Sequence, residues 1–355
     1  MSFDPLDFLS PVQYVDTEPV LMNVSEEKSH LPALHVMDLP QVGSRPPACV
    51  LKTILYLLKS DDICNFGQTP QTRSIETVKR EHPASFAAAE PWLQTHCSLL
   101  CANFSDLGAL PTNDIVSYLT GICGSSLSWM DAADREDVWA LASTIISEKS
   151  GRTAAPGFTR KITVDGLPPI CLREPALTSD NLGLKTWGSS LMLARRLVNF
   201  PRLAEPILEL GAGTGLVGIA CGLLGYKDVV LTDLPEIVPN LKENILLNQL
   251  DLPCEVLDWK NPHAFGSRKF ATVIVSDPIY SADHPVLVRN VVERFLAPEN
   301  AQLLVQLPLR PRYERERAHL WSLIESLGLK EVQSVREEGF DDFGEQSFVF
   351  KMYKP

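Results

Sequence analysis

The stretch of sequence that decides the fold is Glu-Leu-Gly-Ala-Gly-Thr-Gly, residues 209–215. The apolar residues 206–208 before it are typical of the end of a buried strand, and the apolar residues 216–221 after it are typical of a buried helix. Open α/β sheets bind nucleotides where a strand, a glycine turn and a helix follow one another in this order. Glycine permits the sharp turn and lets a ligand lie against bare main chain. The sequence therefore predicts a nucleotide site at this turn.

Three kinds of nucleotide motif can be compared with the turn. The dinucleotide motif G-x-G-x-x-G fails because Leu216 stands where the third glycine is required, and the phosphate-binding loop fails because no lysine follows the glycines. What is left is an acid at the strand end, Glu209, followed by glycines at alternate positions. This pattern suits a ligand with an amino group and no phosphate, such as S-adenosylmethionine. A glycine-rich turn of another α/β protein is the alternative.

The second predicted strand, residues 228–233, also ends in an acid. A carboxylate at this place, Asp233, can accept hydrogen bonds from both hydroxyls of a ribose. The alternative is that Asp233 caps the helix that follows. Pro235 is expected to open that helix, which extends to about Asn248, because proline is favoured in a first helical turn.

The third and fourth predicted strands end in further polar groups. Asp258 and Trp259 follow residues 255–257, and they suit adenine, because the acid can accept from the exocyclic amine and the ring can pack on the base. The fourth strand, residues 271–275, leads into Ser-Asp-Pro-Ile-Tyr. There Asp277 could bind and orient a substrate ammonium, which must lose its proton before it attacks a methyl group. A proline-containing turn with a capping aspartate is the alternative.

Taken in order, these motifs resemble the seven-strand protein lysine methyltransferases, methyltransferase family 16. The Asp-x-x-Tyr motif of that family falls on Asp277 and Tyr280, which the resemblance makes the catalytic pair, and its upstream helical tryptophan falls on Trp187. The resemblance covers residues 156–355. Motifs and resemblance together predict a cofactor site for S-adenosylmethionine made of Trp187, Glu209, Gly211, Ala212, Gly213, Gly215, Asp233, Leu234, Asp258, Trp259 and Ser276.

The rest of the C-terminal region fits the same fold, a Rossmann-like α/β sheet of seven strands that is mostly parallel and whose last pair is antiparallel. Asp-Gly between alternating residues predicts an additional hairpin before the domain. The predicted elements are that hairpin over 160–164 and 170–172, a fifth strand over 301–306, a helix over 314–327, and strands over 330–335 and 347–352 joined by a turn at 339–344.

The N-terminal region differs in kind. Residues 1–45 are rich in proline and are expected to be irregular. Residues 46–150 form a predicted helical domain, with helices starting at Ala48 and over 84–103, 113–122 and 132–149, and residues 150–156 are expected to be a linker. The helical domain could recognise a substrate or cover the sheet, and the sequence leaves both open. His96, Cys97 and Cys101 have the spacing of one helix face, so we predict no metal site there.

Composition limits the partners. The 355 residues carry a formal net charge of −12, which argues against a nucleic acid partner, because phosphates require a basic surface. We predict no membrane partner, a monomer, and a cytoplasmic protein with the nucleus as the alternative; the eight cysteines are expected to be reduced. The basic cluster Arg310, Arg312, Arg315 and Arg317 is interpreted as an ordinary solvated helix face.

The sequence thus predicts a protein lysine methyltransferase that uses S-adenosylmethionine. The resemblance, whose fungal members include some with an N-terminal extension, implies a translation elongation factor as the protein substrate, elongation factor 2 or a related factor. Two alternatives stay open. One is a methyltransferase for glutamine, a nucleobase or a small molecule, since residues 276–280 also resemble Asp/Asn-Pro-Pro-Tyr, although Ile279 replaces the second proline. The other is a non-catalytic protein that binds the cofactor and a partner.

Overall fold

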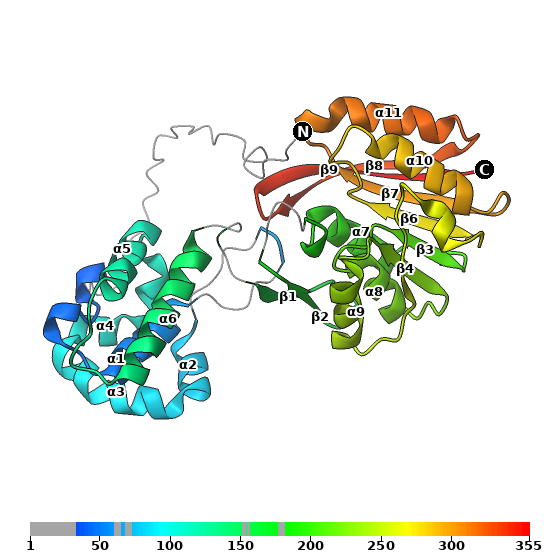
Figure 1. The fold of residues 1–355 in the computed structure, drawn as a ribbon. Helices are drawn as coiled ribbons and strands as arrows, with labels where there is room; N and C mark the ends of the chain where they lie inside the picture. Colours follow the sequence, from blue (N-terminus) through cyan, green and yellow to red (C-terminus); the bar gives the residue numbers. More distant parts are fainter. Residues whose placement is uncertain (1–32, 60–64, 68–72, 151–153, 155–156, 177–181) are drawn as a thin grey trace. The chain divides into compact units, whose positions relative to one another are not determined.

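The computed structural model describes residues 33–355 except 60–64, 68–72, 151–153, 155–156 and 177–181 (Figure 1). The chain divides into two compact units, Met1–Asp61 with Pro70–Pro156 and Asp62–Thr69 with Gly157–Pro355. Of the segment predicted to be irregular, residues 1–32 lie outside the described residues, and 33–45 contain two short 3-10 turns, Val36–Asp38 and Val42–Ser44. Most of the predicted linker, 150–156, also lies outside them.

The N-terminal unit is built of helices around an apolar core. The prediction of one helix over 84–103 is wrong, because the backbone at Cys97 leaves the helical region at φ −137° and ψ 52° and divides that stretch in two. His96 therefore ends one helix, with its ring stacked on Trp92 at 4.2 Å between centroids. The helices are α1 (Ala48–Leu58), α2 (Ile75–Glu81), α3 (Pro83–His96), α4 (Ser98–Ala102), α5 (Thr112–Cys123) and α6 (Ala132–Lys149). Within the described part of the chain, no helix is both long and apolar enough to cross a membrane.

The C-terminal unit contains the predicted hairpin and the predicted seven-stranded sheet. In the hairpin, β1 (Phe158–Ile162) pairs antiparallel with β2 (Ile170–Glu174). The sheet has the order β5-β4-β3-β6-β7-β9-β8. Strands β3 to β7 are parallel and β9 is antiparallel to its neighbours, so the predicted fold class is confirmed. The strands are β3 (Ile207–Leu210), β4 (Val229–Asp233), β5 (Cys254–Val256), β6 (Thr272–Ser276), β7 (Gln302–Pro308), β8 (Lys330–Asp341) and β9 (Gly344–Lys354).

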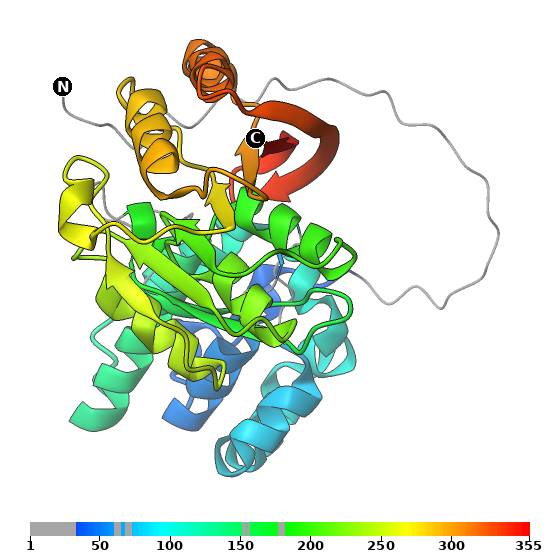
Figure 2. The same ribbon diagram turned by 90° about the vertical axis from the view of Figure 1, so that its right-hand side faces the viewer.

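Helices cover both faces of this sheet. The green helices α7 (Gly188–Val198), α8 (Leu216–Leu223) and α9 (Val238–Leu247) lie on one face in Figure 1. The orange helices α10 (His284–Phe295) and α11 (Glu314–Glu325) lie side by side on the other, as Figure 2 also shows. The apolar faces of α7, α8 and α9 pack on the strands they cover and form a continuous core with them.

Several element boundaries differ from the prediction, and the largest differences are at α9 and at the last two strands. Helix α9 starts at Val238 instead of Pro235, and Pro235 lies in a turn closed by hydrogen bonds from the Ile237 and Val238 amides to the Leu234 carbonyl. Pro239 then takes the place in the first helical turn where a missing N–H costs nothing. The hairpin of β8 and β9 is longer than predicted, and its turn falls at residues 341–344.

A short segment from between α1 and α2 packs with the C-terminal unit, whereas the sequence placed it in the helical domain. Asn65 exchanges two hydrogen bonds with the Thr163 backbone, at 2.9 and 2.8 Å. Phe66 is 7% exposed within the C-terminal core, and the Arg160 guanidinium lies 4.5 Å from its ring centroid. Gly67 has φ +76°, and a Cβ there would come within 2.4 Å of the Phe340 ring. The C-terminal unit therefore includes residues from two separate parts of the chain.

Candidate active site

The predicted site residues gather at one edge of the sheet. The glycine turn follows β3, which lies between β4 and β6 in parallel register. Asp233 is the last residue of β4, Trp259 follows β5, and Ser276 is the last residue of β6. Parallel strands place their carboxyl ends together, and open α/β sheets bind ligands in the crevice outside those ends. The strand order thus brings together four groups that are widely separated in sequence.

The glycine turn is held in place by direct contacts with its neighbours. Gly211 has φ +65°, and a Cβ there would lie 3.0 Å from the Trp259 ring. The Gly213 N–H donates to a carboxylate oxygen of Asp233 at 2.7 Å. The hydroxyls of Thr186 and Thr214 are 2.8 Å apart, which ties the turn to the segment before α7. The main chain of the turn is therefore fixed by hydrogen bonds.

Asp233 is a partly buried carboxylate satisfied by backbone donors. Its other oxygen accepts from the Leu234 N–H at 2.7 Å, and burial raises the pKa of the carboxyl to about 6. Each oxygen keeps a second lone pair for another donor. Asp233 does not cap α9, because that helix starts five residues later with Ile237 as its N-cap. Asp233 is thus arranged to accept hydrogen bonds from ligand hydroxyls.

Two polar atoms near the turn are buried without a partner among the described residues. One is Oε2 of Glu209, whose side chain is 2% exposed and lies against Gly218 of α8. Burial raises the pKa of Glu209 to about 8, and Asp233 adds to the increase. The other is Oγ of Ser276. Unpaired buried polar atoms are rare in folded proteins, and they are a reason to look for a ligand.

Trp187 lies at the N-cap of α7, one residue before the helix in which the sequence placed it. Its Nε1 donates to the Leu182 carbonyl at 3.2 Å. Its ring lies 4.6 Å from the ammonium of Lys185, which is fully buried and pairs with Asp342 at 2.7 Å. Burial lowers the pKa of Lys185, and the Asp342 carboxylate opposes this. Lys185 and Asp342 were missed from the sequence, because only the folded hairpin of β8 and β9 brings them together.

Asp277 forms a two-pronged ion pair that the sequence did not predict. Its two oxygens accept from Nη1 and Nη2 of Arg310, at 3.0 and 3.1 Å. Its φ of +51° is unusual outside glycine, and its N–H donates to the Gln306 carbonyl at 2.9 Å. The interpretation of Arg310 as part of a solvated helix face is wrong, because it precedes α11 and is largely buried against Asp277. The sequence could have indicated this contact, because Arg310 follows β7, which is the neighbour of β6 in the sheet.

Tyr280 lies beside Asp277 in sequence and is 43% exposed. Its ring stands perpendicular to that of His284, with 4.1 Å between centroids, and the Tyr313 hydroxyl donates to its carbonyl at 3.3 Å. Partial burial raises the pKa of Tyr280 to about 12, so the phenol keeps its proton at neutral pH. Burial lowers the pKa of His284, which favours a neutral ring.

The remaining predicted residues occupy the same edge. Ala212 donates its N–H to the Thr232 carbonyl at 3.0 Å, and Gly215 is the N-cap of α8 with φ +89°. An oxygen of Asp258 accepts from the Lys260 N–H at 2.9 Å. The edge therefore combines a glycine turn, a carboxylate for hydroxyl groups, an aromatic ring, and a carboxylate next to an exposed phenol. Such an arrangement can hold a nucleoside and bind a cationic side chain nearby.

Comparisons with known proteins identify the family of this chain. Residues 172–326 match the lysine methyltransferase family. The chain is 34% identical to the protein-lysine N-methyltransferase EFM2 of Saccharomyces cerevisiae, over 98% of this chain and 99% of that protein. It is 35% identical to the protein-lysine N-methyltransferase rrg1 of Schizosaccharomyces pombe, over 67% of this chain and 84% of that protein.

Among solved structures, M. jannaschii TYW2 in complex with AdoMet aligns with 55% of this chain and 86% of that chain, at 16% identity and a TM-score of 0.38. The match to EFM2 extends over nearly the full length of both proteins. The matched length therefore spans the N-terminal helices as well as the C-terminal unit. The chain therefore belongs to the lysine methyltransferase family, as a protein-lysine N-methyltransferase.

Proposed function

We propose that this protein transfers a methyl group from S-adenosylmethionine to a lysine side chain of a translation elongation factor, elongation factor 2 or a related factor. Protein-lysine methylation follows from the family, whereas the cofactor site and the substrate are proposed. The similarity to EFM2 extends over the N-terminal helices as well as the methyltransferase unit. This supports a shared kind of protein substrate in addition to a shared reaction.

The described residues fit S-adenosylmethionine. Asp233 would accept from the ribose hydroxyls, the Trp259 ring would pack on adenine, and the bare main chain of Gly211 and Gly213 would admit the ligand closely. The unpaired oxygens of Glu209 and Ser276 offer acceptors for its polar groups. When bound, the cofactor supplies a methyl group that is electrophilic because it is attached to a sulfonium.

The observation that carries the proposed reaction is the pair of Asp277 and Arg310 at the end of β6. A substrate lysine is protonated at neutral pH and must lose its proton before it can attack. Asp277 has lone pairs left to bind and orient the nitrogen. Arg310 disfavours the positively charged ammonium at the same place, so the pair holds the nitrogen without stabilising its proton. The Tyr280 hydroxyl can donate to or accept from the substrate at the exposed side.

Labelled methyl transfer tests this proposal. We would incubate S-adenosylmethionine with a cell extract that lacks the protein, and add either wild type or Asp277→Asn. We expect one labelled protein with the size of an elongation factor, absent with the variant, and mass spectrometry should place the label on a lysine. Label in nucleic acid, in a small molecule or on glutamine would contradict the substrate. Absence of label, with the cofactor still bound in calorimetry, would contradict the enzymatic role.

A further inference from the structure

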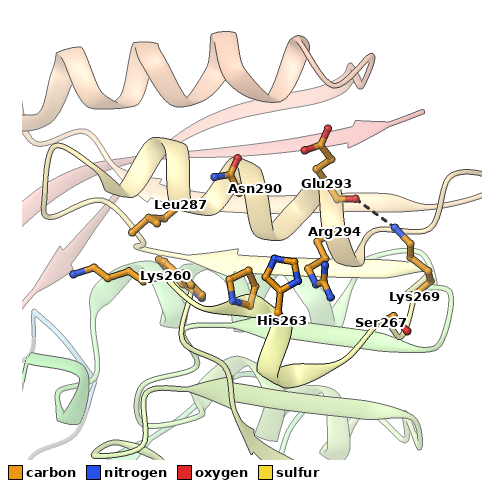
Figure 3. A pocket seen from close by; sticks show the side chains of 10 residues that line it. Lys260, His263, Ser267, Lys269, Leu287, Asn290, Glu293 and Arg294 are labelled. Carbon is orange, nitrogen blue, oxygen red and sulfur yellow. Dashed lines mark hydrogen bonds between the residues drawn. The ribbon is translucent and has the colours of Figure 1, made fainter.

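A groove outside the proposed catalytic residues lies between α10 and the connection from β5 to β6 (Figure 3). Its volume is about 690 Å³, within the size range of small ligand sites. One wall is the face of α10 that carries Leu287, Asn290 and Arg294, which recur at helical spacing. The facing wall includes Lys260 and Lys269. We call this feature the basic groove.

The cations of the basic groove are not neutralised within the described part of the chain. Lys260, Lys269 and Arg294 form no ion pair with any described carboxylate. Lys269 reaches only two backbone carbonyls, at 3.4 and 3.3 Å. Arg294 donates to the Gly266 carbonyl at 2.7 Å, while its Nε is buried without a partner. The acid in the lining, Glu293, is engaged by Arg289.

This local excess of positive charge contrasts with the whole protein, which has a formal net charge of −12. Neighbouring Arg268, in contrast, pairs with Glu255 at 2.7 Å. Lys260, Lys269 and Arg294, which form no ion pair within the described part of the chain, are therefore available to an anionic ligand.

The basic groove is continuous with the catalytic edge. Trp259 belongs to its lining and lies 6.0 Å from the ring of His284, which in turn touches Tyr280. Lys260 is close enough to contribute to lowering the pKa of His284, although burial is the larger cause. A protein segment whose lysine reaches Asp277 can thus continue along α10 into the groove.

We propose that the basic groove binds an acidic segment of the protein substrate, next to the target lysine in the substrate chain. This inference rests on the proposed function and names the chemistry by which that site selects its substrate. Carboxylates of the segment would pair with Lys260, Lys269 and Arg294. Cations outside a catalytic centre mainly increase the rate of encounter and the specificity, so the groove governs substrate binding more than the chemical step.

The test compares two double variants that change the net charge equally. Lys260→Glu/Arg294→Glu reverses the charge of the groove, and Lys242→Glu/Lys330→Glu reverses two exposed lysines elsewhere. Binding is measured by fluorescence anisotropy with a labelled decaglutamate peptide and with a ten-nucleotide oligouridylate as the competing anion. We expect wild type and the control variant to bind decaglutamate, and the groove variant to bind it about tenfold more weakly, with a loss that shrinks as salt screens the charges.

Methyl transfer gives a second measurement, on the acceptor that the labelling experiment identifies. We expect the groove variant to raise KM about tenfold with kcat and cofactor binding unchanged, as is typical of charges that act on encounter. Failure of wild type to bind decaglutamate, equal binding by all three proteins, or tighter binding of the RNA would overturn the proposal. Because peptide binding requires no methyl transfer, these outcomes are distinguishable from a failure of the proposed function.

Discussion

Two carboxylates lie at the ends of the strands on either side of β3, and their hydrogen-bond donors differ: backbone amides for one and a guanidinium for the other. Asp233, at the end of β4, accepts from the Gly213 and Leu234 amides and forms no ion pair with any cation among the described residues. Asp277, after β6, is gripped on both oxygens by the Arg310 guanidinium. A carboxylate held by amides suits neutral hydroxyl donors, whereas a carboxylate already paired with a guanidinium attracts a second cation less strongly. In the proposed function, Asp233 thus belongs to the cofactor side of the site and Asp277 to the substrate side.

The largest effect should come from removing the charge on the substrate side. Asp277→Asn keeps the shape of the side chain but leaves Arg310 without its main partner, so a lysine ammonium is repelled. We expect methyl transfer to fall at least about 100-fold, in the range typical for loss of a group that handles a proton. Cofactor binding, measured by calorimetry, should change little. Asp283→Asn, which removes an exposed acid at the start of α10, serves as the control. Equal losses of methyl transfer in both variants would contradict a specific role for Asp277.

The next effect concerns the cation of the same pair. Arg310→Gln removes the charge that disfavours a protonated lysine, so the pKa of the bound lysine should rise and less of it is neutral at pH 7. We expect about a tenfold loss of kcat at pH 7 and a shift of the kcat profile to higher pH by about one unit, the size expected for one screened charge at close range. Arg310→Lys should restore the profile in part. A profile with unchanged shape would assign Arg310 a purely structural role.

A smaller effect is expected on the cofactor side, where shape matters more than charge. Gly211→Ala forces a Cβ to within 3.0 Å of the Trp259 ring at a φ of +65°. We expect cofactor affinity to fall about fivefold, which corresponds to about 1 kcal/mol of strain and displacement. The matched control is Gly225→Ala, which has a φ of +89° and open space around the added Cβ. Equal losses of cofactor affinity in both variants would mean that contact with the Trp259 ring does not cause the loss in Gly211→Ala.

The smallest effect on activity at neutral pH should come from Glu209→Gln. Burial raises the pKa of Glu209 to about 8, so the acid is mostly protonated at pH 7. Glutamine resembles this uncharged form. Its folded pKa lies above the unfolded value of 4.5, so the folded state holds the extra proton and wild type loses stability as pH rises from about 4.5 to 8. Glu209→Gln does not titrate. Its Tm advantage over wild type should therefore grow between pH 5 and pH 8, by about 2–4 °C for each kcal/mol of stability difference. A constant difference in cofactor-free thermal scans would contradict the raised pKa.

The order of the strands along the chain could be predicted, because each signal is local. Runs of apolar residues mark β3, β4 and β6, and an acid marks each nearby strand end. The same reasoning placed the glycine turn next to Asp233, since parallel strands share one edge. What escaped prediction depends on contacts between distant residues. Arg310 is 33 residues from Asp277 in the chain, and Asp342 meets Lys185 only through the hairpin of β8 and β9.

Local signals also failed where two tendencies competed. Pro235 and Pro239 both suit a first helical turn, but Pro235 lies in the turn closed on the Leu234 carbonyl, and the helix starts with Pro239 in its first turn. The stretch 84–103 is helical in character throughout, but the backbone turns at Cys97 all the same. The polar pattern of Arg310 to Arg317 is that of a surface helix, although its first member is buried by an ion pair.

The insertion of Phe66 under Arg160 has a consequence for how this protein can be divided. A fragment that begins at Gly157 would contain every predicted catalytic and cofactor residue, yet it would lack one side chain of its own core and the two Asn65 hydrogen bonds to Thr163. The catalytic unit is thus discontinuous in the sequence. A proteolytic cut between α1 and α2 would therefore damage it as well as the helical unit.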